Sequence, residues 1–228
     1  FNDSLMFLLP KVIHAASEDS PAHRTASDTR PLNVTNTDNR ILANAVRARL
    51  EDIMSEWISR SQRGFLTGRS MLANVVDVEE AMMRTALEHD KGAAIFFDFK
   101  AAFPSVLHSF LLATLRHLQL PAAIIHFIEA LYTKNACQIV LGGSRHEGFS
   151  LCAGIRQGCP LSPLLFAIVA DLLLRRLQRL LPEATIKAYA DDLAVIHHDE
   201  HALVQCCSHA FEEYGAISGL RLNLPKTV

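Results

Sequence analysis

Apolar side chains recur every three or four positions in several long stretches of the chain. This spacing predicts helices over residues 37–57, 70–86, 107–118, 121–132, 164–180 and 201–217. Thr37 or Asp38 is expected to cap the first helix and Ser70 the second, because their side chains can accept a hydrogen bond from an unpaired backbone N–H group. The apolar positions of the second helix, which include Leu72 and Val75, are expected to face the core.

Shorter apolar runs, bounded by polar residues or glycine, predict strands. They lie at residues 7–11, 30–34, 93–99, 138–141, 149–152, 185–190, 193–196 and 220–224. The fourth and fifth runs flank Gly142 and Gly143 and predict a hairpin, and the sixth and seventh predict a tight hairpin with Asp191 and Asp192 at its tip. The polar residues 15–29 predict a loop. Strands and helices follow one another without regular βαβ repetition, which predicts an α+β fold.

The composition bounds the class of protein. With 228 residues, half of them apolar, the chain can form one large domain or two small ones. The most apolar run, residues 161–174, contains Asp171 and is followed by two arginines, so we expect a buried helix and no membrane span.

Charge gives conflicting indications about a nucleic-acid partner. The formal net charge of −2 counts against one, since proteins that bind nucleic acids usually carry a basic surface. Basic residues nevertheless cluster locally, which fits either such a surface or ordinary solvated helix faces. The clusters are Arg47 with Arg49, Arg60 with Arg63 and Arg69, and Arg175 with Arg176 and Arg179.

The cysteines and histidines indicate no obvious metal or disulfide framework. Five cysteines occur without a CxxC pair, which predicts reduced thiols in an intracellular protein. The tract at residues 197–201, His-His-Asp-Glu-His, could bind a metal. We favour the polar end of a strand that leads into a helix, because no partner ligands are evident in the sequence. Residues 5–9 are a poor signal peptide, and we expect the chain to begin and end inside a longer polypeptide.

Two carboxylate positions stand out in apolar surroundings. Asp98 and the pair Asp191 and Asp192 lie at the ends of predicted buried strands, where a charge is costly unless it is paired or bound to a metal. Carboxylates brought together repel one another, and a divalent cation between them removes that penalty. Oxygen ligands without His or Cys suit Mg²⁺ or Mn²⁺. Taken alone, the pattern is more typical of turn and capping carboxylates than of a metal site.

The motifs that contain these carboxylates resemble those of reverse transcriptases. The run Phe-Phe-Asp-Phe-Lys-Ala-Ala-Phe at residues 96–103 resembles the first catalytic motif of the family, and Tyr-Ala-Asp-Asp at 189–192 resembles its YADD signature. Between them, Gly-Ile-Arg-Gln-Gly-Cys-Pro-Leu-Ser-Pro at 154–163 is similar to a third motif. Near the end, Gly-Leu-Arg-Leu-Asn-Leu-Pro-Lys-Thr at 219–227 is similar to a fourth.

Two upstream segments resemble the fingers motifs of non-LTR retrotransposon and group II intron enzymes. They are Arg-Pro-Leu at 30–32 and Gln-Arg-Gly-Phe-Leu-Thr-Gly-Arg at 62–69. The six motifs follow the family order over nearly the whole chain, and the segment at 36–43 resembles the fingers helix of the non-LTR group. A departure from the family pattern is Pro104, where many relatives carry Asp.

The resemblance implies a polymerase architecture. We expect an N-terminal fingers subdomain over residues 1–92 and a palm over 93–228, an antiparallel sheet packed on helices. Residues 107–153 could return to the junction between fingers and palm. The family's thumb is expected to be absent from this chain.

The resemblance also assigns roles to the acidic residues. Asp98 and Asp191 would be the main ligands of Mg²⁺ or Mn²⁺, and Asp192 would be the second acid of its pair. The backbone carbonyl of Phe99 would also face a metal. Phe103 lies five residues after Asp98, at the family's steric-gate position, where an aromatic ring would clash with a ribose 2′-OH.

Other positions are assigned to the nucleotide. Gln157 and Gly158 would line the incoming nucleotide and the template base, and glycine suits a close backbone approach to a ligand. Lys11 and Arg30 would clamp the triphosphate, where their charges neutralise the leaving pyrophosphate. Lys226 would protonate or stabilise that pyrophosphate.

The function implied is RNA-directed DNA polymerisation, by two-metal transfer of a dNTP to a primer 3′-OH. The implied partners are an RNA template, a DNA or RNA primer and the remainder of a retrotransposon polyprotein, with no membrane. The expected location is intracellular, with the nucleus as a candidate compartment. One alternative is an RNA-directed RNA polymerase, against which Phe103 argues. Another is a catalytically incomplete, RNA-binding fragment of a retroelement.

Overall fold

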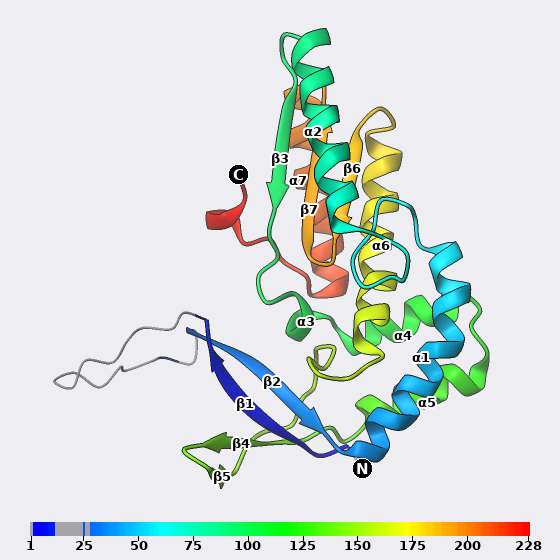
Figure 1. Ribbon diagram of the computed structural model, residues 1–228, viewed down its shortest axis with the longest axis vertical. Helices are drawn as coiled ribbons and strands as arrows, with labels where there is room; N and C mark the ends of the chain where they lie inside the picture. The colour runs from blue at the N-terminus through cyan, green and yellow to red at the C-terminus, as the bar shows by residue number, and fades with distance from the viewer. Residues whose placement is uncertain (1, 12–24, 26–27) are drawn as a thin grey trace, which may run out of the picture.

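A computed structural model of the chain describes residues 2–11, 25 and 28–228. Most of the loop predicted over residues 15–29 lies outside these residues. The described residues form two sheets, one above the other in Figure 1, with helices around both. The α+β fold class expected from the sequence is confirmed.

The lower sheet in Figure 1 has the strand order β2-β1-β4-β5. Strand β1, Ser4–Pro10, pairs antiparallel with β2, Thr29–Thr35, and parallel with β4, Cys137–Leu141. Strand β5, Ser144–His146, pairs with β4 at the outer edge. Residues about 130 positions apart in the sequence therefore meet in one sheet.

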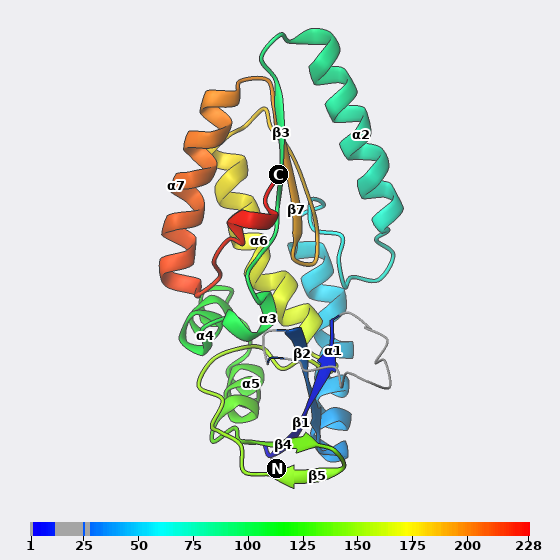
Figure 2. The same cartoon turned by 90° about the vertical axis from the view of Figure 1, so that its left-hand side faces the viewer.

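The upper sheet has the order β3-β7-β6 and is antiparallel throughout. Its strands are β3, Ala93–Phe97, β6, Thr185–Tyr189, and β7, Asp192–His197. Helices α6, Ser162–Leu180, and α7, Glu200–Ser218, cover one face, and α2, Met71–Glu88, lies on the other side in Figure 2.

The remaining helices surround the lower part of the molecule. They are α1, Thr37–Trp57, α3, Ala102–Ser105, α4, His108–His117, and α5, Ala122–Tyr132. Within the part of the chain that the structure describes, no helix combines the length and apolar character that a membrane crossing requires.

Helix α6 is the centre of the hydrophobic core. Residues 164–169 are all buried, and so is Asp171, which interrupts the apolar run. Its carboxylate accepts hydrogen bonds from the backbone N–H of Ser59 at 3.0 Å and from the Arg175 guanidinium at 2.6 Å. A buried charge needs such partners. The helix therefore joins the core to the segment that follows α1. The buried helix predicted over residues 164–180 is confirmed.

Both predicted helix caps differ in detail from the structure. Asn36, one residue before Thr37, caps α1, because its side chain accepts a hydrogen bond from the backbone N–H of Asp38 at 2.9 Å. Ser70 does precede α2, but its side chain makes no capping hydrogen bond.

Two strand predictions are also corrected. The partner of β4 in the hairpin is β5, directly after Gly143, whereas the predicted partner 149–152 forms only a single bridge, between Ser150 and Ala136. The predicted strand 220–224 is reduced to a bridge between Leu222 and Phe99, and a 3-10 turn, Leu224–Lys226, follows it. Both segments are short, and their pairing depends on residues distant in sequence.

The predicted burial of α2 is wrong for most of its apolar positions. Leu72 and Val75 are 70% and 53% exposed, whereas Asn74 and Ala81 are buried. The small side chain of Ala81 packs on Ala194 and Ile196, and Asn74 donates a hydrogen bond to the carbonyl of Ala188 at 2.8 Å. The helix therefore contacts the sheet through small and polar residues, and its larger apolar residues face outward.

Candidate functional site

The three aspartates singled out in the sequence lie at one end of the upper sheet. Asp98 follows β3 directly, and Asp191 and Asp192 lie at the turn between β6 and β7. In the register of the sheet Phe97 pairs with Leu193, so the next residue pair outward is Asp98 with Asp192. Neighbouring strands are about 4.8 Å apart. The register therefore places Asp98 opposite Asp192, and Asp191 precedes Asp192 in the turn.

The acids influence one another electrostatically. Partial burial, followed by the negative charges of Asp191 and Asp98, raises the pKa of Asp192 above its ordinary value. Lys226 acts in the opposite direction. A raised pKa here means that a negative charge on Asp192 is disfavoured, and a divalent cation would remove that penalty. The residues present, three carboxylates at one strand end, fit a hard cation such as Mg²⁺ or Mn²⁺.

The segment that follows α7 holds Asp98. The Asn223 amide donates a hydrogen bond to the Asp98 carboxylate at 2.7 Å, and the Lys226 ammonium lies 3.8 Å from it. The backbone N–H of Asn223 donates to the Asp98 carbonyl at 2.8 Å. The structure thus brings Lys226 to the carboxylates. It also adds Asn223, which the sequence showed only as part of a motif.

The backbone of Phe99 remains available at this site. The bridge to Leu222 uses the carbonyl of Asp98 and the N–H of Lys100, and it leaves the Phe99 carbonyl outside the pairing. The Phe99 ring is buried and lies 5.8 Å from the ring of Phe211, which anchors the backbone.

A buried glutamine supports the turn that carries Asp191. The Gln62 amide oxygen accepts hydrogen bonds from the backbone N–H groups of Ala190 at 3.0 Å and Gly64 at 2.8 Å. Its NH₂ group donates to the Ala190 carbonyl at 3.1 Å. Ala190 has a φ of 59°, a left-handed conformation that a non-glycine residue adopts only when its surroundings hold it. We conclude that Gln62 fixes the backbone immediately before Asp191 and Asp192.

Close backbone packing surrounds this glutamine. The segment before Gly64 adds to the edge of β6 through hydrogen bonds between Arg63 and Ala188 and between Ala188 and Ser61, both 2.8 Å. A side chain at Gly64 would place its Cβ 2.0 Å from the backbone nitrogen of Ala190. Glycine is therefore required for the approach of this segment to the turn.

Several arginines of the predicted basic clusters make hydrogen bonds or ion pairs within the protein. The Arg69 guanidinium donates to the carbonyls of Ser55, Ile58, Ser59 and Gln62, and so fixes the loop that carries Gln62. Arg63 pairs with Asp77 at 2.7 Å, and Arg176 pairs with Glu213 at 2.9 Å. Arg63 and Arg69 therefore have structural partners, whereas the exposed Arg176–Glu213 pair fits a solvated helix face.

Phe103 lies in α3 between two other aromatic rings. Its ring stacks on Phe166 of α6, with centroids 4.7 Å apart, and meets the edge of Phe65 at 5.7 Å. Phe65 comes from the loop between α1 and α2, so the ring of Phe103 is held from two directions. A ring fixed in this way can act as a rigid steric barrier.

Gln157 and Gly158 contact the lower sheet. The backbone N–H of Asn33 in β2 donates to the Gln157 carbonyl at 3.0 Å. Gly158 has a φ of 110°, and a Cβ there would lie 2.5 Å from the Asn33 carbonyl oxygen. Glycine is therefore required at position 158 because the backbone lies close to β2. From the sequence, this glycine was expected to allow a close approach to a ligand.

Lys11 and Arg30 belong to a different sheet from the three aspartates. Arg30 pairs with Leu9 in the register of β1 and β2, and Lys11 follows β1 directly. Both lie at the end of the strand pair that leads into residues 12–24. The structure does not join them to the carboxylates, and their predicted role remains a prediction.

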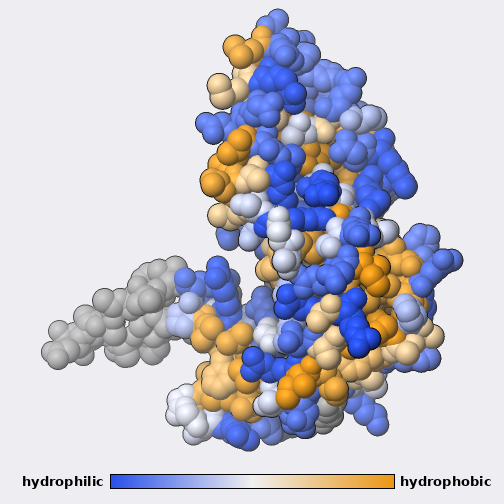
Figure 3. Space-filling model, turned by 45° about the vertical axis from the view of Figure 1, so that its right-hand side comes forward, coloured by the Kyte–Doolittle hydropathy of each residue, from blue (hydrophilic) through white to orange (hydrophobic). Residues whose placement is uncertain are grey.

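A cleft of about 790 Å³ adjoins the carboxylates. Asp98, Asp192 and Lys226 line part of it, and apolar residues of α2 and β3, such as Val75 and Phe96, line the rest. Figure 3 shows apolar side chains at the surface of the upper part of the molecule and an indentation between the upper and lower parts. The volume is in the range of ligand-binding clefts.

Residues 18–228 match the family model described as "Reverse transcriptase (RNA-dependent DNA polymerase)". The chain is 31% identical over 208 residues to the Pol polyprotein of the type-2 retrotransposable element R2DM of Drosophila melanogaster. The aligned segment covers 87% of the chain and 19% of that protein. It is 27% identical over 216 residues to an uncharacterized 149 kDa protein of transposon TX1 from Xenopus laevis, which covers 90% of the chain and 16% of that protein.

Solved structures share the fold. Telomerase from Candida tropicalis, in complex with a fragment of telomeric RNA, superposes with a TM-score of 0.73 at 14% identity over 100% of this chain and 41% of the telomerase chain. The apo telomerase truncated from its C-terminal domain gives 0.72. This likeness supports the fingers-and-palm fold expected from the sequence. With the family match over nearly its whole length and relatives among retrotransposable elements, the chain belongs to the reverse transcriptase family, of the non-LTR retrotransposon kind.

Proposed function

We propose that this chain is the fingers and palm of an RNA-directed DNA polymerase that acts as part of a larger retrotransposon polyprotein. The observation that carries the proposal is the gathering of Asp98, Asp191 and Asp192 at one strand end, beside Lys226 and a cleft of about 790 Å³. The relatives R2DM and TX1 are polyproteins or large proteins of which this chain spans 19% and 16%. The remainder of such a protein would be its first partner.

The carboxylates would hold two Mg²⁺ or Mn²⁺ ions, with Asp98 and Asp191 as main ligands and the Phe99 carbonyl beside them. When bound, such ions activate an attacking oxygen and neutralise charge on the leaving group. The protein would fix their positions: Asn223 orients the Asp98 carboxylate, and Gln62 holds the turn that carries Asp191. The Lys226 ammonium, 3.8 Å from Asp98, would stabilise the pyrophosphate as it leaves.

The reaction would be attack of a primer 3′-OH on the α-phosphate of a dNTP, with release of pyrophosphate. Catalysis of this kind depends chiefly on positioning and on electrostatic stabilisation. Gln157 and Gly158 would line the nucleotide and template base from the junction with β2. Lys11 and Arg30 would clamp the triphosphate from the ends of β1 and β2.

Phe103 supports DNA synthesis over RNA synthesis. Its ring is held between Phe65 and Phe166 at 5.7 and 4.7 Å, so it could not move aside for a ribose 2′-OH without disturbing α6. An RNA template and a DNA or RNA primer complete the proposed set of substrates. Five free cysteines support an intracellular location, and we include the nucleus in the proposal.

Primer extension tests the proposal. The substrate is poly(rA)/oligo(dT) with dTTP and either Mg²⁺ or Mn²⁺, and the variant is Asp191→Asn. The matched control is Asp52→Asn, a change of the same kind at an exposed position of α1. Extension by the wild type and by the control, but not by Asp191→Asn, is the expected result.

Two further outcomes separate the alternatives. Incorporation of rUTP as efficient as that of dTTP would favour an RNA polymerase. Folded protein that binds RNA in a salt-dependent manner, with no extension by any variant, would favour the catalytically incomplete fragment.

A further inference from the structure

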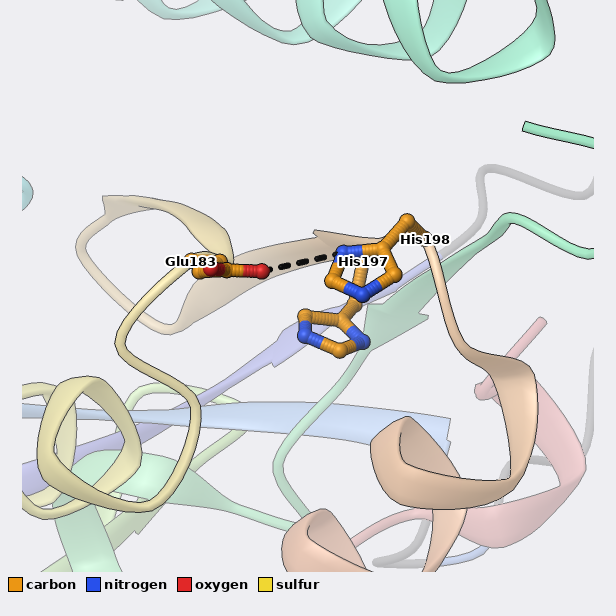
Figure 4. Close-up of side chains that lie close together, drawn as sticks. All are labelled: Glu183, His197 and His198. Atoms are coloured by element: carbon orange, nitrogen blue, oxygen red, sulfur yellow. Dashed lines mark ion pairs between the residues drawn. The ribbon is translucent and has the colours of Figure 1, made fainter. Parts of the chain in front are cut away.

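Two histidines and a glutamate gather at the opposite end of the β6–β7 hairpin from the aspartates. Glu183 lies in the turn between α6 and β6, and His197 and His198 lie at the end of β7 (Figure 4). Strand β7 runs from Asp192 to His197, which places the two ends about 17 Å apart at 3.3–3.4 Å per residue. This cluster is therefore separate from the carboxylate site.

The spacing of the three side chains suits a single metal ion. One ligand atom from each residue lies within 4.8 Å of the others, and the His198 Nδ1 atom is 3.5 Å from a Glu183 carboxylate oxygen. Ligand atoms around a tetrahedral ion with bonds of about 2.0–2.1 Å lie roughly 3.3–3.4 Å apart. The pair Glu183 and His198, at 3.5 Å, is close to this separation, and the third ligand atom needs a shift of at most about 1.5 Å.

A backbone contact orients His197. Its Nδ1 atom lies 3.1 Å from both the carbonyl oxygen and the backbone nitrogen of Asp199, at the start of α7, so it either donates to the carbonyl or accepts from the N–H group, according to the tautomer. In the tautomer that carries its proton on Nδ1, this atom donates to the carbonyl and leaves Nε2 free to bind a metal. A histidine that donates its second ring nitrogen to a carbonyl is the usual arrangement at protein metal sites.

Accessibility and the donor atoms indicate which ions could bind. His197 is 8% exposed, whereas the side chains of His198 and Glu183 are 37% and 75% exposed. The ion would therefore contact the buried His197 on one side and remain accessible to solvent on the other. Two imidazole nitrogens and one carboxylate oxygen suit Zn²⁺ and similar transition-metal ions better than Mg²⁺. The His89 ring, with its centroid 5.0 Å from that of His198, offers a candidate fourth ligand, and water could take that position instead.

We propose that Glu183, His197 and His198 form a binding site for Zn²⁺ or a similar transition-metal ion. The histidine tract of the sequence lacked a partner ligand because Glu183 is fourteen residues away and meets it only through the pairing of β6 with β7. A bound ion would tie the α6–β6 turn to the β7–α7 junction. This role is structural and does not depend on the proposed polymerase activity.

Zn²⁺ titration against a competing chromophoric chelator tests the site in the 228-residue chain. The background carries Cys152→Ser, because the exposed Cys152 thiol is a competing zinc ligand. The variants are Glu183→Gln and His198→Gln. The matched control is His209→Gln, because His209 lies 3.2 Å from Glu213 on α7 and tests whether any exposed His–Glu pair binds as well.

The proposal predicts one tight Zn²⁺ per chain. Glu183→Gln and His198→Gln should each weaken binding by at least about tenfold, since even an outer-shell partner changes metal affinity by roughly 10–100-fold. His209→Gln should leave binding unchanged, and Zn²⁺ should raise the Tm of the wild type but not of Glu183→Gln.

Two results would overturn the proposal. The first is equal affinity in the wild type, Glu183→Gln and His198→Gln, provided that circular dichroism shows all three folded. The second is loss of the tight Zn²⁺ in Asp191→Asn, which would place the ion at the carboxylates. Retention in Asp191→Asn supports the separate site whether or not primer extension succeeds.

Discussion

Removal of the Gln62 amide should loosen the turn before Asp191. The side chain is fully buried, and its three hydrogen bonds all go to backbone groups, two on Ala190 and one on Gly64. Gln62→Met keeps the length of the side chain and removes its polar atoms. It leaves two N–H groups and one carbonyl without their partner in the interior.

The cost follows from the burial of these groups. An unpaired buried donor or acceptor costs about 1–3 kcal/mol, and some of this penalty disappears if water enters or the turn relaxes. We expect Gln62→Met to lower the free energy of unfolding by about 2–4 kcal/mol. Since domains of this kind are stable by about 5–15 kcal/mol, the variant should remain folded at 25 °C.

Gln178→Met is the matched control. The Gln178 amide also donates to three backbone carbonyls, those of Leu181, Pro182 and Ala184, at 2.9–3.4 Å. Residue 178 is exposed, however, so water can replace the lost hydrogen bonds. The control should therefore lose less than about 1 kcal/mol, although the same residue type and a similar number of contacts are removed.

Urea unfolding followed by circular dichroism measures both free energies, and primer extension measures the consequence at the site. Because a displacement of about 1 Å at a catalytic group can cost roughly 100-fold in rate, Gln62→Met should slow extension at least about tenfold where the protein is folded. If Gln62→Met and Gln178→Met lose equal stability and extend equally fast, the amide does not position Asp191.

Three further predictions concern the same region. Phe103→Ala should raise the use of rUTP relative to dTTP by at least about tenfold in competition assays, since a shape contact of this size discriminates by roughly 10–200-fold. An unchanged ratio of rUTP to dTTP incorporation would exclude a steric gate at Phe103. Asn223→Ala should raise the Mg²⁺ concentration for half-maximal extension by about tenfold, because it removes the 2.7 Å hydrogen bond that orients Asp98. If the Mg²⁺ dependence is unaltered and only the stability falls, the role of Asn223 is purely structural. The hydrogen bond from Lys187, aided by Arg63, holds the pKa of Asp77 below its ordinary value, so ionised Asp77 stabilises the fold above its unfolded pKa and this contribution is lost as the pH falls. Asp77→Asn should therefore cost about 1 kcal/mol at pH 7 and progressively less below about pH 4 in urea unfolding, and a deficit that stays constant with pH would contradict this ion pair.

The sequence determined the elements whose evidence is local. The spacing of apolar residues predicted all the long helices, and the strands around Asp98, Asp191 and Asp192 were placed within a few residues of their observed bounds. Both kinds of pattern are set by backbone periodicity, which is a property of neighbouring residues. The motif resemblance then singled out Asp98, Asp191 and Asp192 as candidate site residues, because the motifs are contiguous stretches of sequence.

Contacts between distant residues were decided only by the tertiary structure. Leu72 resembles a core residue in the sequence, yet it is exposed, because α2 approaches the sheet through Ala81 and Asn74. The stretch at 220–224 has the composition of a strand, but only Leu222 forms a bridge, since the chain turns to bring Asn223 and Lys226 to Asp98.

The hydrogen bonds that support the turn between β6 and β7 were also decided by contacts between distant residues. Gln62 and Ala190 are 128 positions apart, and neither carries a local signal of their hydrogen bonds. Glu183 likewise meets His198 only because β6 and β7 form a hairpin in one particular register. Local sequence records which backbone conformation is favourable for a segment, whereas the partners of a buried polar group are fixed only when the segments pack together. The placement of the three acids at strand ends could therefore be predicted from the sequence, and the residues that hold them in position could not.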